Sequence, residues 1–338
     1  MKTMKSFFYR LSLSAFFFLV SFYAVFASVP MDVVERGEGF SQRASTFYPV
    51  TFPREHRWPR AKVSKERVDL TGLSFITIDP EGARDLDDAL YVEEGKKGGY
   101  HIAIAIADPT YYIQPHSPVA QEARNRGFTV YGEGTPVPML PQKLVHVCSL
   151  GEGKKRPAVI VDLFIDKNGA FKGEPSIYRA LVRSQHKLSY RSVNDIYRGR
   201  WFSVINPHLK KKLFILQGAA QALKSYYSKD EEALMSQDVV SEFMVTANNA
   251  VAMHLKKMVV ESRIKKAVFR AQGDVESRAF YTSESSFHAS FDLIYTHFTS
   301  PLRRYADMMV HWLLFHPGYT FSKTALDYMG SVAKKVRS

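Results

Sequence analysis

The stretch Phe75-Ile-Thr-Ile-Asp-Pro-Glu-Gly-Ala-Arg-Asp-Leu-Asp-Asp-Ala-Leu90 joins two apolar, strand-like runs through a turn crowded with acids. The acids are Asp79, Asp85, Asp87 and Asp88, with Glu81 beside them. Carboxylates this close repel one another unless a cation or a basic partner lies among them. Because Mg²⁺ binds through a few carboxylate oxygens, the stretch predicts a hard-metal site between two strands. A solvated acidic turn and a structural Ca²⁺ loop are the alternatives at this stage.

Composition indicates a folded, basic protein. The chain has 338 residues, of which 46% are hydrophobic and 13% aromatic, so it can bury a sizeable core and is not a disordered chain. The 46 Lys and Arg outnumber the 33 Asp and Glu, and the formal net charge of +13 favours a polyanionic partner such as nucleic acid. A basic surface that serves only solubility or membrane contact is the alternative. The single Cys148 excludes an internal disulfide framework and a cysteine-rich zinc site.

The N-terminus has the layout of a signal peptide. Lys2, Lys5 and Arg10 precede an apolar, aromatic-rich run, and no acid occurs before Asp32. Residues 11–29 are also nearly long enough to cross a bilayer as an uncleaved anchor. A third interpretation is that translation begins at Met31.

Domain organisation and fold class follow from the pattern of apolar runs and breakers. We divide the chain into a signal-like or membrane-anchor segment (1–30), a proline-containing lead-in or linker (31–70) and one large domain (71–338). Apolar runs between turn signals predict strands at 73–79, 90–93, 100–107, 158–166 and 174–184. Helical periodicity predicts helices at 119–126, 210–227 and 238–260. The expected fold class is therefore α+β.

A second group of functional residues lies in His297-Phe-Thr-Ser-Pro-Leu-Arg-Arg-Tyr-Ala-Asp307. Serine followed by proline predicts a helix that begins at Ser300 and ends near His316. Arg303 and Arg304 would then occupy its first turn, where a cation is unfavourable, so the pattern favours a specific anionic partner. The structural alternative is an ion pair between Arg303 and Asp307 within the helix, contributing a few tenths of a kcal/mol.

The two segments together resemble the RNB family of exoribonucleases, the group of bacterial RNase II and RNase R. The first is similar to the family pattern Thr-Ile-Asp-x-x-x-Ala-Arg-Asp-x-Asp-Asp-Ala, and the second to His-Phe-Thr-Ser-Pro-Ile-Arg-Arg-Tyr. Residues 105–112, 122–131 and 138–150 lie between them in the family's order. The resemblance covers residues 65–316 and implies an RNB-type catalytic domain with a mixed sheet and packed helices.

The resemblance also implies roles for individual residues. It places Asp79, Asp85, Asp87 and Asp88 at the metal site, Asp87 and Arg303 as the catalytic residues, and Tyr131, Glu242 and Arg304 as RNA contacts. The implied activity is Mg²⁺-dependent hydrolysis of single-stranded RNA from the 3′ end, with Mn²⁺ as the other candidate ion and nucleoside 5′-monophosphates as products. The family implies a cytoplasmic location, whereas the signal-like segment favours export or membrane anchoring.

Three departures from the family pattern leave other functions open. About 70 residues precede the first motif, too few for two N-terminal OB-type domains, and the chain ends soon after residue 316. The spacing between Gln272 and His297 is also short, as though a helical hairpin were missing. The alternatives are therefore a catalytically impaired RNB-like protein that binds RNA, and a metal-dependent phosphodiesterase tethered to a membrane through residues 11–29. Protein partners and oligomeric state are not indicated.

Overall fold

The computed structural model describes residue 52 and residues 66–95, 98–131, 136–200, 206–227 and 233–328. The predicted leader (1–30) and nearly all of the predicted lead-in (31–70) lie outside these residues. The strands of the main sheet are β1 (Val68–Asp69), β2 (Phe75–Asp79), β3 (Asp88–Glu94), β4 (Tyr100–Ala107), β5 (Lys155–Ile165) and β6 (Ser176–Ser189). Shorter strands follow later in the chain: β7 (Phe269–Ala271), β8 (Phe280–Thr282), β9 (Phe287–His288) and β10 (Leu293–Ile294). The helices are η2 (Pro109–Tyr111), α3 (Pro118–Arg126), α4 (Gln142–Cys148), α5 (Tyr190–Tyr197), α6 (Pro207–Tyr227), α7 (Ser236–Val260) and α8 (Tyr305–Phe315).

The first six strands form one mixed sheet in the order β1-β6-β2-β3-β4-β5, and β6 also pairs with β5. The first half of β6 runs antiparallel to β5. Its second half runs parallel to β2, with Ser189 opposite Asp79. The sheet therefore closes on itself. This register also brings the end of β6 to the end of β2, where the acidic turn begins.

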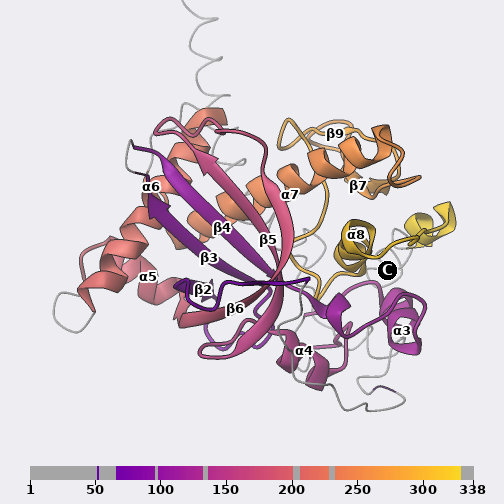
Figure 1. Cartoon of the computed structure of the whole chain (residues 1–338), viewed down its shortest axis with the longest axis horizontal. Helices are drawn as coiled ribbons and strands as arrows, with labels where there is room; N and C mark the ends of the chain where they lie inside the picture. The colour runs from indigo at the N-terminus through magenta and orange to yellow at the C-terminus, as the bar shows by residue number, and fades with distance from the viewer. Residues whose placement is uncertain are drawn as a thin grey trace, which may run out of the picture.

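Helices α6 and α7 pack together and cover the sheet, α6 against β3 and α7 against β5 (Figure 1). The central strand β4 is buried throughout Ile102–Ala107, which explains its almost continuous apolar sequence. The expected α+β class is confirmed, with helices at the predicted places 119–126, 210–227 and 238–260. Over the described residues, none of the helices is long and apolar enough to cross a membrane.

The predicted start of the last helix is wrong. Helix α8 begins at Tyr305 rather than Ser300, so Arg303 and Arg304 do not lie in its first turn. Residues 300–304 instead form a turn whose end is extended, since Arg304 has φ −136° and ψ 127° and bridges Phe128. The predicted first helical turn is interrupted because Thr129 donates its N–H to the Arg303 carbonyl and Tyr305 donates its N–H to the Gly127 carbonyl. The predicted end is close to the observed one, Phe315.

Candidate active site

The acidic turn is held between two strands and buttressed from a distant segment. Its backbone is secured through Ser149, whose Oγ accepts the Leu86 N–H at 3.2 Å and donates to the Arg84 carbonyl at 2.9 Å. The next residue, Leu150, donates its N–H to the Leu86 carbonyl at 3.0 Å. Each of these bonds spans more than 60 residues of sequence. The segment at 149–150 therefore fixes the conformation of the loop that carries Asp85 and Asp87.

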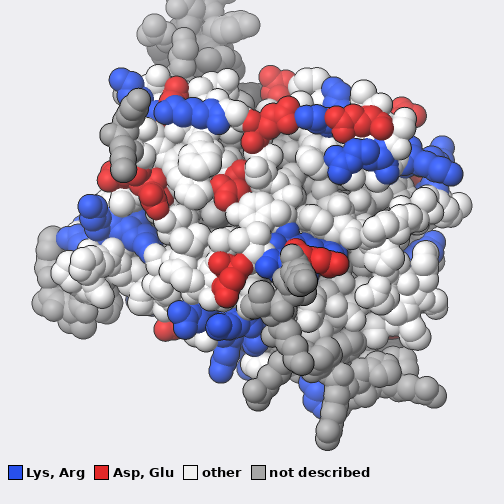
Figure 2. Space-filling view, in the orientation of Figure 1, with Lys and Arg blue, Asp and Glu red and all other residues white. Residues whose placement is uncertain are grey.

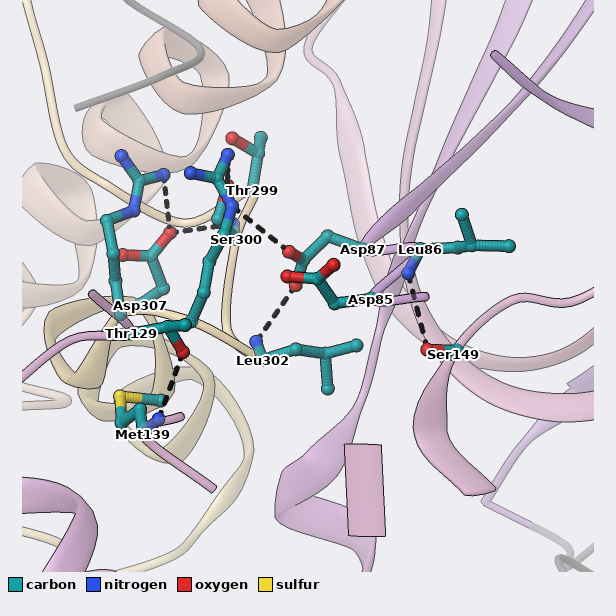
Figure 3. A network of polar contacts seen from close by, with 12 residues as sticks. Asp85, Leu86, Asp87, Thr129, Met139, Ser149, Thr299, Ser300, Leu302 and Asp307 are labelled. Atoms are coloured by element: carbon teal, nitrogen blue, oxygen red, sulfur yellow. Dashed lines mark hydrogen bonds and ion pairs between the residues drawn. The ribbon is translucent and has the colours of Figure 1, made fainter. Parts of the chain in front are cut away.

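The two sequence motifs meet at Asp87. Its Oδ1 accepts the Leu302 N–H at 2.8 Å, and Arg303 Nε lies 3.4 Å from its Oδ2 (Figure 3). Both side chains are largely buried, with 5% of Asp87 and 18% of Arg303 exposed. The alternative of an Arg303–Asp307 pair is wrong, because Asp307 pairs with Arg304 at 2.9 Å instead. Arg303 is thus placed beside the acidic turn.

Three carboxylates of the turn, those of Asp79, Asp87 and Asp88, are in an environment that disfavours their charge. Burial, together with the charges of Asp85 and Asp88, raises the pKa of Asp87 to about 8, although Arg303 opposes the shift. Burial also raises the pKa of Asp79 and of Asp88, and these two carboxylates repel each other's ionised form. The buried Oδ2 atoms of Asp79 and Asp87 have no hydrogen-bond partner. A cation among these oxygens would stabilise the ionised state.

This donor set fits a hard divalent ion, since it consists of carboxylate oxygens, two of which are buried without a hydrogen bond. The type of donor atom suits such an ion, whereas the arrangement of the donors does not yet form a coordination site. Among the described residues, no three His, Cys, Asp or Glu side chains are grouped closely enough to hold a metal ion. The predicted ligands Asp79, Asp85, Asp87 and Asp88 lie on one turn between β2 and β3, and their role as metal ligands stays a prediction.

Comparison with protein families agrees with the two motifs. The family model described as the RNB domain matches residues 67–273 and 258–317. The chain belongs to the RNB family. The match falls into two stretches that overlap at residues 258–273, next to the short connection between Gln272 and His297.

Relatives of this RNB chain include exoribonuclease 2 of Proteus mirabilis, 33% identical over 249 residues that cover 68% of this chain and 36% of the relative. Exoribonuclease 2 of Vibrio vulnificus is 42% identical over 131 residues, covering 38% of this chain and 20% of the relative. Ribonuclease R of Mycoplasmopsis pulmonis is 28% identical over 333 residues, covering 74% of this chain and 44% of the relative. The chain thus spans less than half the length of each of these relatives.

Solved structures share the fold of the RNB chain. RNase R of Mycoplasma genitalium in its apo form superposes with a TM-score of 0.72 at 22% identity, covering 90% of this chain and 60% of that one. The same enzyme in complex with ribose-methylated single-stranded RNA gives 0.69 at 22% identity, covering 89% and 58%. Yeast Ssd1, described as a pseudonuclease, gives 0.68 at 19% identity, covering 82% and 45%. At these identities the likeness is one of fold alone.

The structure of this RNB domain places the predicted RNA contacts in three different settings. The Tyr131 hydroxyl donates a hydrogen bond to Asp85, so its ring lies beside the acidic turn. Arg304 is buried against Asp307 with 4% of its side chain exposed. Glu242 is half-buried on α7, where burial raises its pKa to about 7, and within the described part of the chain no hydrogen bond or ion pair joins it to the acidic turn. All three RNA-binding roles stay predictions.

Tyr190 is a residue of this site that the sequence does not reveal. It directly follows Ser189, which lies opposite Asp79 in the parallel pairing of β6 with β2. Burial raises the pKa of the Tyr190 hydroxyl, and the charges of Asp88 and Asp79 add to the shift. Only the register of two strands more than 100 residues apart brings Tyr190 here. No local pattern in the sequence signals it.

Proposed function

We propose that this RNB domain hydrolyses single-stranded RNA from the 3′ end with Mg²⁺ or Mn²⁺ and releases nucleoside 5′-monophosphates. The observation that carries the proposal is the contact between the two motifs, in which Leu302 N–H and Arg303 Nε both meet the Asp87 carboxylate. A carboxylate cluster facing an arginine is suited to in-line displacement at a phosphodiester, because each half stabilises charge on a different set of oxygens.

The roles of the residues follow from their charge and position. Asp79, Asp85, Asp87 and Asp88 would hold the divalent ion, which lowers the pKa of an attacking water and neutralises charge on the phosphate when bound. Water adds to the terminal phosphorus, the bond to the 3′ oxygen of the preceding nucleotide breaks, and that oxygen takes a proton. Arg303 would stabilise the negative charge that develops on the phosphoryl oxygens. Tyr131 would stack on a base, a contact that tolerates any sequence.

RNA is the favoured substrate for two reasons. The relatives carry the names exoribonuclease 2 and ribonuclease R, and one structural neighbour was solved with single-stranded RNA. The formal net charge of +13 also suits a polyanion. We propose a cytoplasmic location on the same grounds. Fractionation of cells that carry a C-terminally tagged chain would test this location and the membrane-anchor alternative for residues 11–29 together.

The deciding experiment uses the full chain with single-stranded RNA labelled at either the 5′ or the 3′ end. In Mg²⁺, the 3′ label should appear at once as a mononucleotide, whereas the 5′-labelled strand should shorten gradually. EDTA should stop both processes, and circular RNA of the same composition should stay intact. Absence of shortening in Mg²⁺, Mn²⁺ or any other divalent ion would overturn the proposal.

The second candidate is an RNB domain that binds RNA without cleaving it. The shared fold with Ssd1, described as a pseudonuclease, shows that this fold is compatible with such a role. The same assay separates the candidates, since the binding protein would retard single-stranded RNA on a gel and leave its length unchanged.

A further inference from the structure

Asp307 forms part of a buried polar network next to the candidate active site. It lies in the first turn of α8 and is fully buried. Its Oδ1 accepts two hydrogen bonds, from the Ser300 N–H at 2.7 Å and from Arg304 Nη2 at 2.9 Å (Figure 3). Arg304 compensates the charge of this carboxylate, and a buried carboxylate without such a partner would be costly. The position of Ser300 is therefore set by a carboxylate seven residues further along the chain.

Ser300 extends this network to the arginine of the site. Its Oγ accepts a hydrogen bond from Arg303 Nη2 at 2.9 Å. Its carbonyl accepts the N–H groups of Arg303 and Arg304 at 3.2 and 3.0 Å, which closes the turn. On the other side, Thr129 donates its N–H to the Arg303 carbonyl at 2.9 Å. Both the backbone and the side chain of Arg303 are thereby held.

The turn presents two groups to the acidic loop in a fixed arrangement. Leu302 N–H and Arg303 Nε reach the two oxygens of Asp87, at 2.8 and 3.4 Å. An arginine side chain free to rotate would lose much entropy on adopting one productive orientation. A network that fixes this orientation in advance contributes to the rate without touching the substrate.

We propose that Asp307 is a positioning residue that aims Arg303 at Asp87, with Ser300 as the intermediate. The chain of contacts runs from the Asp307 carboxylate to the Ser300 N–H, from Ser300 Oγ to Arg303 Nη2, and from Arg303 Nε to Asp87. The kinetic part of the test rests on the proposed exoribonuclease function. The orientation of Arg303 is measured without activity.

The test compares Ser300→Ala, Ser300→Thr and Asp307→Asn with the wild-type full chain. Ser300→Ala removes only the acceptor of the Arg303 side chain, so kcat should fall about tenfold while KM stays within about twofold. Ser300→Thr restores the hydroxyl and should recover most of kcat. Asp307→Asn should lower kcat at least as far as Ser300→Ala. If it does not fold, because Arg304 is left without its buried partner, the serine pair of variants carries the test.

The second readout is the Arg303 Nε–H signal in a ¹⁵N–¹H spectrum, assigned with Arg303→Lys. It should be sharp in the wild-type protein and shifted or broadened in Ser300→Ala and Asp307→Asn. Glu174→Gln is the matched control, because it removes an exposed carboxylate paired with Lys257 and should leave both readouts unchanged. An unchanged kcat in Ser300→Ala, or a lowered kcat with an unchanged Arg303 signal, would overturn the proposal. If the wild-type chain degrades no RNA, the proposed function fails and the Arg303 signal alone decides the positioning role.

Discussion

The surroundings of Asp87 act on its charge in two opposite ways. Leu302 N–H and Arg303 favour the carboxylate, whereas burial raises its pKa to about 8. A bound divalent ion would resolve this conflict in favour of the ionised form. The residue at which both motifs converge is therefore the one whose charge should matter most for cleavage.

Asp87→Asn should reduce RNA cleavage by about 100-fold or more, since the amide keeps the shape of the side chain but lacks the charge that holds a cation. RNA affinity at low salt should stay within about threefold of wild type, because the basic residues are untouched. Cleavage rates and filter binding measure the two effects. Asp327→Asn, which changes an exposed aspartate, should alter neither. Loss of binding in step with cleavage would mean that Asp87 serves the fold or the RNA contact instead.

At the scale of elements, a metal site in the loop between β2 and β3 should make metal binding depend on pH. Burial raises the pKa values of Asp79, Asp87 and Asp88 above 3.8. Between about pH 4 and pH 8 the folded protein therefore binds more protons at these groups than the unfolded chain does. Their contribution to the free energy of unfolding consequently falls as pH rises through this window. A divalent ion counteracts this loss by binding the ionised carboxylates.

The stabilisation by Mg²⁺ should accordingly be larger at pH 8 than at pH 6. The measurement is the difference in Tm between protein in Mg²⁺ and protein in EDTA at each pH, which cancels the contributions of other titrating groups to first order. Asp87→Asn should reduce this difference at pH 8. Equal differences at the two pH values would contradict a metal site built from these carboxylates.

Ser149 connects the acidic loop to the end of α4, and its hydrogen bonds to the loop backbone should support the proposed metal site. Ser149→Ala removes two hydrogen bonds and leaves the Leu86 N–H and the Arg84 carbonyl without this partner. The free energy of unfolding should fall by about 1–3 kcal/mol, and Mg²⁺ affinity by roughly tenfold. Ser117→Ala is a suitable control, because it removes the cap of α3 at a cost of about 1 kcal/mol and has no contact with the loop. A similar change of Mg²⁺ affinity in both variants would show a general effect of lost stability.

The sequence predicts elements better than it predicts how they meet. Helix α7 and strands β2 to β4 were predictable because their apolar periods reflect burial along single elements. The start of α8 was not, because Arg304 is extended against Phe128 and Tyr305 donates its N–H to the Gly127 carbonyl instead of to a carbonyl one helical turn earlier. Both contacts join this turn to a segment far earlier in the chain, and local capping preference cannot include them. The Arg303–Asp87 contact was not predictable either, because it joins residues 216 positions apart in the sequence.

At the scale of the whole molecule, the charge of +13 has to be reconciled with an acidic candidate active site. On the face drawn in Figure 2, basic and acidic side chains lie side by side, and the positive charge is not gathered into one patch. RNA would therefore be attracted by the summed field and by scattered lysines and arginines, while the acids act only where the ion is bound. Affinity and cleavage should depend on different parts of the molecule.

This separation predicts different responses to salt. Raising KCl from 50 to 200 mM should weaken the binding of single-stranded RNA about 20- to 100-fold, the effect of releasing counterions from three to five phosphates. The cleavage rate at saturating RNA should change far less, because the contact between Asp87 and Arg303 is largely buried and poorly screened. Fluorescence anisotropy at several salt concentrations and single-turnover cleavage at saturating RNA measure the two quantities. A single-turnover rate that falls as steeply as the affinity would mean that the exposed basic residues take part in the chemical step. Affinity and cleavage would then not depend on different parts of the molecule.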